Sequence, residues 1–268
     1  MTTWPAAFCA TNGISLHYTR TGGGKPPVIL LHGLMTNGLC WTHLARALEP
    51  EYDVILPDAR GHGQSGAPDH GYRYEDHAAD IIGLIQALQL PPVVLLGHSM
   101  GGMTAAVVAS RSPMLLRGLV LADPTFLSPE MQRQVQESDV AEQHRRMLRL
   151  SLAEVLADAR VRHPHRSAET LELLARARLQ TSLKAFEVLT PPNPDYRALV
   201  RQIPVPSLLL VGDKGLVSAA VAEELQRLNP NLQAEQIREA GHALQFDQPN
   251  QFAAVVGRFL RAIGNAAR

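Results

Sequence analysis

Residues 93–101 read Val-Val-Leu-Leu-Gly-His-Ser-Met-Gly, and this stretch decides how the rest of the chain is interpreted. The four apolar residues are typical of a buried strand, and the small residues of 102–110 favour a helix directly after the turn. A strand that turns at once into a helix forces the residue at the tip into a strained conformation, and glycines at the two ends of the turn let neighbouring backbone pass close by. We therefore expect Ser99 to be a nucleophile on this turn, with its hydroxyl exposed above the sheet at a helix N-terminus.

On either side of this strand, short apolar runs alternate with segments of helical periodicity. Each run is followed by a turn: Val28–Leu31, Val54–Pro57, Val93–Leu96, Leu119–Ala122 and Ser207–Val211. Continuous apolar runs suit parallel strands that are buried on both faces. The alternation predicts an α/β fold with a mostly parallel, doubly wound sheet of about eight strands. Ahead of it, Ala6–Thr11 and Ile14–Thr19 are expected to form an antiparallel hairpin through Asn12-Gly13, because both turn residues tolerate positive φ.

The strand pattern stops between Phe126 and about Tyr196, where the sequence is typical of helices throughout. Five apolar residues of this stretch are expected to share one helix face: Leu148, Leu152, Val155, Leu156 and Ala159. Ser128-Pro129-Glu130 favours a helix start, with serine as the cap and proline in the first turn. The prolines of 191–194 end the helical region. We predict that residues 127–196 form a helical lid over the strand ends, inserted into a core of residues 1–126 and 197–268.

A second motif, Leu30-Leu31-His32-Gly33-Leu34, follows another predicted strand. A loop at this place brings a second backbone N–H beside the nucleophile, and an oxyanion hole needs two such donors. We expect these donors to be the N–H groups of Leu34 and Met100. The alternative is that Leu34 only lines the pocket.

The third motif is Ala240-Gly241-His242, which follows a predicted strand over 232–237. A histidine suits the task because its pKa of about 6.5 lets it accept the serine proton and return it. The chain has 11 histidines, so position must decide among them. His32 and His62 lie in glycine-rich turns and are interpreted as structural. His98 is expected to point away from the serine, which leaves His242 as the base.

Composition argues against several other classes of function. Lys plus Arg and Asp plus Glu number 25 each, and this zero net charge argues against a nucleic-acid partner. No apolar run approaches the ~20 residues of a membrane helix, and the N-terminus lacks the pattern of a signal peptide. Cys9 and Cys40 are the only cysteines and make no disulfide framework. We therefore expect a cytoplasmic protein, monomeric or homodimeric, that acts on a small-molecule substrate without binding membranes.

Together these motifs resemble the α/β-hydrolase superfamily. The resemblance rests on HGL at 32–34, on Asp-Ala-Arg-Gly-His-Gly-Gln-Ser at 58–65, on GHSMG at 97–101 and on AGH at 240–242. It spans nearly the whole chain and implies a serine–acid–histidine triad in that chain order. The resemblance implies Ser99 and His242 as two members of the triad, with no metal and no organic cofactor.

The triad acid is where the sequence departs from the superfamily. Most members carry it in a turn after the seventh strand, and the matching position here is Gly215, which has no side chain. Asp213 lies two residues earlier. Asp123 ends the strand beside the nucleophile strand, where catalytic groups gather in such sheets, and some members, including certain dehalogenases, carry the acid there. We favour Asp123 as the acid and keep Asp213 as the alternative; a third interpretation makes Asp123 only a cap of the following turn.

A narrower resemblance concerns residues 211–220 in combination with Asp123. These residues are similar to the (E)-2-(acetamidomethylene)succinate hydrolases within the superfamily, which act on an enamide that bears carboxylates. Several arginines of the predicted lid are candidates for holding such a carboxylate: Arg145, Arg146, Arg149, Arg160, Arg162, Arg166, Arg176 and Arg178. Interspersed acidic residues favour the alternative that these arginines lie on ordinary solvated helix faces.

The combined pattern predicts a serine hydrolase that cleaves a small-molecule ester, amide or lactone through an acyl-enzyme. Hydrolysis of a C–C bond in a ring-cleavage product uses the same groups. Relatives with that activity usually carry a longer glycine-rich oxyanion loop than residues 34–38 offer. A non-catalytic ligand-binding protein on the same fold is the third interpretation, which an incomplete triad would favour.

Overall fold

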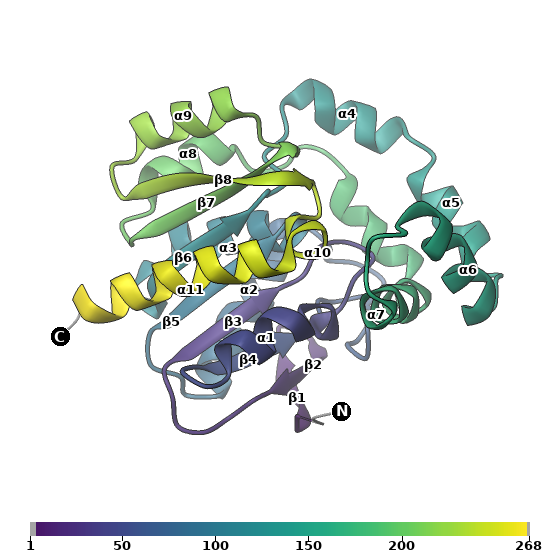
Figure 1. Cartoon of the computed structure of the whole chain (residues 1–268), viewed down its shortest axis with the longest axis horizontal. Helices are drawn as coiled ribbons and strands as arrows, with labels where there is room; N and C mark the ends of the chain where they lie inside the picture. Colours follow the sequence, from purple (N-terminus) through teal and green to yellow (C-terminus); the bar gives the residue numbers. More distant parts are fainter. Residues whose placement is uncertain (1–3, 267–268) are drawn as a thin grey trace.

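An eight-stranded sheet forms the centre of the protein, which a computed structural model describes over residues 4–266 (Figure 1). The strand order is β1-β2-β4-β3-β5-β6-β7-β8. β1 is antiparallel to β2 and β2 is antiparallel to β4, whereas every other neighbouring pair is parallel. The strands are β1 (Ala6–Thr11), β2 (Ile14–Arg20), β3 (Pro27–Leu31), β4 (Asp53–Pro57), β5 (Val93–His98), β6 (Leu116–Ala122), β7 (Ser207–Lys214) and β8 (Leu232–Gly241). The predicted fold class is confirmed.

The antiparallel hairpin turns at the predicted dipeptide. Asn12 has a φ of 43° and Gly13 a φ of 77°, which are the positive values that a two-residue hairpin turn requires. Several strands are longer than the apolar runs indicate, most clearly β8. β8 lies at the edge of the sheet, so it carries exposed charged residues that an apolar pattern does not mark.

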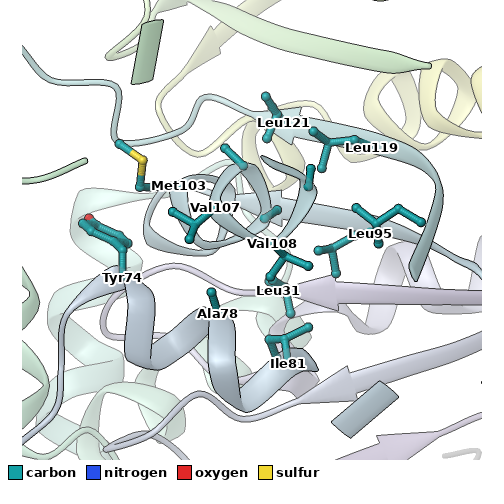
Figure 2. Packing of buried hydrophobic residues seen from close by; sticks show 14 of the residues in the cluster. Leu31, Tyr74, Ala78, Ile81, Leu95, Met103, Val107, Val108, Leu119 and Leu121 are labelled. Carbon is teal, nitrogen blue, oxygen red and sulfur yellow. The ribbon is translucent and has the colours of Figure 1, made fainter. Parts of the chain in front are cut away.

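Helices cover both faces of the sheet. One face packs against α2 (Tyr74–Ala87), α3 (Met100–Arg111), α8 (Tyr196–Gln202) and α9 (Ala219–Leu228). The other face packs against α1 (Thr42–Leu48) and α11 (Pro249–Ala266), with the short helices η1 (Gly38–Trp41) and α10 (Leu244–Asp247) nearby. Figure 2 shows the first core, in which side chains of α2 and α3 meet strand residues such as Leu31, Leu95, Leu119 and Leu121. This double layer holds the carboxyl ends of the parallel strands in place.

The chain between β6 and β7 is mainly helical. After the short η2 (Pro113–Leu115) and strand β6 it forms α4 (Pro129–Glu137), α5 (Val140–Met147), α6 (Leu152–Arg162), α7 (Ala168–Leu179) and η3 (Leu183–Leu189), and then α8. Serine or aspartate side chains cap several of these starts, at Ser128, Ser151, Ser167 and Asp195. Figure 1 shows α4–α7 beyond the end of the sheet toward which the arrow of β8 points. The division into core and lid stays a prediction.

One expectation about this segment is wrong. Leu148 does not share a helix face with Leu152 and Val155, because α5 ends before it and α6 begins after it. The Ser151 hydroxyl accepts a hydrogen bond from the Glu154 N–H, and the Ser151 N–H donates to the Glu154 carboxylate, which is a strong local helix start. No helix within residues 4–266 is long and apolar enough to cross a bilayer.

Candidate active site

Ser99 occupies the sharp turn between β5 and α3, with φ of 54° and ψ of −119°. A Cβ on Gly97 would collide with the carbonyl of Gly101, so the turn is closed only because the chain has glycine there. The residue is 8% exposed, less than the open hydroxyl that the sequence led us to expect. The reason is the neighbouring loop, since a Cβ on Gly33 would lie 3.1 Å from the Ser99 Cβ.

Three residues far apart in the sequence form a continuous chain of hydrogen bonds at this turn. The Ser99 hydroxyl lies 3.0 Å from His242 Nε2. The other ring nitrogen, Nδ1, lies 2.6 Å from Asp123 Oδ2. Asp123 follows β6 and His242 follows β8, so both lie at the carboxyl end of the sheet, where β5 ends as well. The structure thus brings the three favoured residues together.

The Asp123 carboxylate is held from a second side. It is fully buried, and its two oxygens accept hydrogen bonds from the backbone N–H groups of Leu216 (2.8 Å) and Val217 (2.9 Å). Asp123 itself has a positive φ of 40°. Sequence reasoning did not identify these two donors, because backbone groups leave no trace in the identity of a residue. They orient the carboxylate toward His242.

The alternative acid lies elsewhere. Asp213 is exposed, and its carboxylate accepts hydrogen bonds from Gln236 Nε2 (2.7 Å) and from the Glu239 N–H (2.6 Å). These contacts tie β7 to β8. Gly215, at the position where most of the superfamily has its acid, lies against Asp123: a Cβ there would be 2.6 Å from Asp123 Oδ1. The missing side chain therefore makes room for the carboxylate that comes from β6.

The two predicted oxyanion donors belong to Met100, which follows Ser99, and to Leu34, whose neighbour Gly33 lies beside Ser99. Met100 is the first residue of α3, and the first N–H groups of a helix have no partner within it. Gly33, next to Leu34, packs against Ser99 as described above, and its carbonyl accepts hydrogen bonds from the N–H and the hydroxyl of Thr36. These bonds close the turn that carries Leu34. The role of the two N–H groups stays a prediction.

His32 and His62 brace this loop. His32 donates from Nδ1 to the Gly33 carbonyl (2.8 Å) and accepts the Ala59 N–H at Nε2 (2.9 Å). His62 accepts the Met35 N–H at Nε2 (3.3 Å). Burial lowers the pKa of both rings, so they are neutral and each offers one donor and one acceptor. Their geometry agrees with the structural interpretation.

His98 has a contact that the sequence did not reveal. Its Nε2–H donates to the backbone carbonyl of His242 at 2.8 Å, and the centroids of the two rings are 4.7 Å apart. Burial lowers the pKa of His98 to about 3, so the ring is neutral. The Trp41 ring packs against it with an angle of 84° between the two ring planes. His98 does not contact Ser99 with its ring nitrogens but holds the loop of His242; its only sequence signal is its place in the motif.

The arrangement has a defined chemical capacity. A serine hydroxyl bonded to an imidazole, which is itself bonded to a buried carboxylate, can lose its proton to the imidazole as it attacks a carbonyl. The N–H groups at the start of a helix can stabilise the oxyanion that forms. In the described residues 4–266, no three His, Cys, Asp or Glu side chains gather in a way that could hold a metal ion.

A sheet of this order, with a serine at the sharp turn after β5 and a histidine after β8, defines the α/β-hydrolases. The family described as alpha/beta hydrolase fold matches residues 26–249, and the chain belongs to it.

Known relatives place the chain among hydrolases. It is 30% identical over 256 residues to N-formylmaleamate deformylase of Pseudomonas putida, with 94% of each chain covered. It is 27% identical to 2-(acetamidomethylene)succinate hydrolase of Mesorhizobium japonicum, over 93% of this chain and 92% of that protein. The crystal structure of an E-2-(acetamidomethylene)succinate hydrolase superposes with a TM-score of 0.82 at 25% identity, covering 96% of this chain and 99% of the other. The expected similarity is confirmed, and the chain is an enzyme of the hydrolase class.

Proposed function

We propose that this hydrolase cleaves a small-molecule ester, amide or lactone through an acyl-enzyme on Ser99. The hydrogen-bond chain from Ser99 through His242 to Asp123 carries the proposal. The serine oxygen attacks the substrate carbonyl carbon while His242 Nε2 takes the hydroxyl proton. The oxyanion is stabilised by the N–H groups of Met100 and Leu34. His242 then gives its proton to the departing alcohol or amine, and water releases the acyl group in the same way.

Asp123 acts through His242 in this proposal. Its carboxylate accepts the Nδ1–H, which fixes the ring in the tautomer that leaves Nε2 free to accept a proton. The buried carboxylate also stabilises the imidazolium that forms during attack.

We further propose that residues 127–196 cover the strand ends as a lid, because α4–α7 lie beyond the end of the sheet (Figure 1).

The names of the relatives support the range of substrates. They include a deformylase, an sn-1-specific diacylglycerol lipase and, among solved structures, an enol-lactonase and esterases. The relatives are thus named for the hydrolysis of several kinds of carbonyl substrate, and the fold alone does not choose among these substrates.

An acyl-enzyme is expected to be trapped on Ser99. Rapid mixing with p-nitrophenyl acetate should release a burst of about one p-nitrophenol per active site if deacylation is slower than acylation. Acid quenching followed by peptide mass mapping should place the acetyl group on the peptide that contains Ser99. The Ser110→Ala variant, altered at the far end of α3, should give the same burst. An acetyl group on another residue would contradict the proposal. So would an enzyme that hydrolyses C–C bonds of ring-cleavage products but no ester, amide or lactone.

His98 is expected to act as a positioning residue for His242. His98→Phe keeps a ring in place but removes the donor to the His242 carbonyl, whereas His98→Gln keeps a donor at similar reach. A displaced base costs up to about 100-fold in rate for a shift of about 1 Å. We expect His98→Phe to lower kcat by about 10- to 100-fold with KM little changed, and His98→Gln to recover most of the loss. Equal losses in both variants, or a matching loss of thermal stability, would indicate only a structural role.

A further inference from the structure

Arg178 differs from the other lid arginines in its surroundings. It lies near the end of α7, which packs against α6 (Figure 1), and it is partly buried. Among residues 4–266, its guanidinium has no acceptor at hydrogen-bonding distance, and burial lowers its pKa. Arg176, two residues earlier, is exposed and lies 2.7 Å from the Glu172 carboxylate. A partly buried cation with no partner is costly to a fold unless an anion joins it.

The charged neighbours of Arg178 do not supply that anion. Arg162 already pairs with Asp158 on the preceding turn of α6, and Arg166 pairs with Asp247 at 2.6 Å. Both arginines add positive charge near Arg178 and lower its pKa further, whereas the charge of Asp158 raises it. Asp158 is shared with Arg162 and makes no hydrogen bond to Arg178 in the described residues.

The other titratable neighbours are neutral. Burial and the charge of Arg166 lower the pKa of His163. Burial raises the pKa of the Cys40 thiol to about 12, so it stays protonated. One positive charge is therefore left over in this cluster.

The cluster surrounds a small cavity between α6 and α7. Its volume is about 40 Å³, which exceeds the ~10–15 Å³ that a single water requires. Arg162, Arg166 and Arg178 line one part of it together with Asp158 and His163. The remaining walls are apolar: Met147, Val155, Ala159, Leu171, Leu174 and Ala175. A space of this size, with cationic and apolar sides, suits a carboxylate on a short hydrocarbon better than a bulkier dianion.

We propose that this cavity binds a carboxylate, with Arg178 as its main donor. A guanidinium binds a carboxylate through two parallel N–H···O bonds, and this geometry strengthens the pair. The same chemistry has two sources: a free short-chain carboxylate, or an acid group on the substrate, and the second source rests on the proposed function. Neither source requires turnover for binding to be measured.

Binding is tested with acetate on the Ser99→Ala protein, so that failure of the proposed chemistry does not affect the result. Isothermal titration at constant ionic strength in chloride should give saturable one-to-one binding of acetate, and none of the neutral isostere acetamide. Arg178→Met should weaken acetate binding at least tenfold, since a charge-assisted bond is removed. Arg176→Met, the matched exposed arginine, should leave it unchanged. The proposal fails if acetate binding to the Ser99→Ala protein with Arg178 intact does not saturate, or if both methionine variants bind acetate equally.

Thermal unfolding guards against a trivial loss of structure. Methionine keeps the hydrocarbon part of Arg178 and removes its unpaired charge, so the Arg178→Met protein should melt about 2–4 °C above the wild type without acetate. Acetate should raise the melting temperature of the wild type and not that of the variant, because only the folded wild type binds it. An equal acetate response in both proteins would overturn the proposal.

Kinetics with active enzyme distinguish the two sources. A neutral substrate, p-nitrophenyl acetate, is compared with the mono-p-nitrophenyl ester of succinate, which carries a free carboxylate. If the cavity holds an acid group of the substrate, Arg178→Met raises KM for the succinate ester alone and free acetate competes with it. If the cavity holds a free carboxylate, acetate binding leaves KM for both esters unchanged. Both results keep the site, and they assign its ligand.

Discussion

Ser99→Ala is expected to lower kcat for p-nitrophenyl acetate by about 10⁴- to 10⁶-fold, because the acyl-enzyme cannot form without the hydroxyl. The residual rate comes from the backbone N–H groups and the binding of substrate, which the substitution leaves in place. The change removes one oxygen from a residue that is only 8% exposed, so the melting temperature should stay close to that of the wild type. KM should change little, since the lost interaction belongs to the transition state.

Two controls make this result specific. An organophosphonate should add its mass to Ser99 in the wild type and leave the Ser99→Ala protein unlabelled. Ser110→Ala lies on α3 as well and should retain full activity. A Ser99→Ala protein that keeps more than about one percent of kcat with unchanged folding would show that another group performs the attack.

Asp123→Asn is expected to lower kcat by about 10⁴-fold at neutral pH, whereas Asp213→Asn should leave it within a few fold. Asparagine keeps the size of the side chain, but its amide group is not an ionised partner for His242 Nδ1 and favours the wrong ring tautomer. Among the described residues, Asp213 bonds with Gln236 and Glu239 of β8, so its loss acts on the edge of the sheet.

The measurement is kcat and KM for one ester in both variants, with the melting temperature as a check on folding. Asp123 also accepts the N–H groups of Leu216 and Val217, so some loss of stability in Asp123→Asn is expected. Activity should nevertheless fall at temperatures where the variant is fully folded. The reverse order, with Asp213→Asn inactive and Asp123→Asn active, would move the role of the acid to β7.

The parts of the fold that the sequence predicts well are those with a local cause. Apolar runs such as Val93–Leu96 indicate strands because a strand buried on both faces cannot carry polar side chains. Asn12-Gly13 predicts the hairpin because few other residues accept its backbone angles. Ser99 and His242 are likewise marked by their motifs, and the structure places Ser99 Oγ 3.0 Å from His242 Nε2.

Other features depend on packing between distant segments. The proximity of Gly215 to Asp123 joins two loops 92 residues apart, so the sequence could favour Asp123 over Asp213 only through its place at a strand end and the resemblance to members that carry the acid there. The bond from His98 to the His242 carbonyl uses a backbone acceptor, which any residue offers. The sequence does not distinguish Arg178 from Arg176, because helical spacing does not tell which of two charged side chains a neighbouring helix will bury.

A side chain at position 215 would occupy the volume of the Asp123 carboxylate, and this constrains how such an enzyme changes over evolution. Moving the acid from position 123, after β6, to position 215, after β7, takes two substitutions. Both single-substitution intermediates are expected to lose stability or activity. A chain with both acids presses two like charges together, and a chain with neither leaves the imidazole unsupported. Lineages that differ at this pair are therefore separated by a step that selection resists, and the pair is a marker of common descent that the serine motif itself cannot provide.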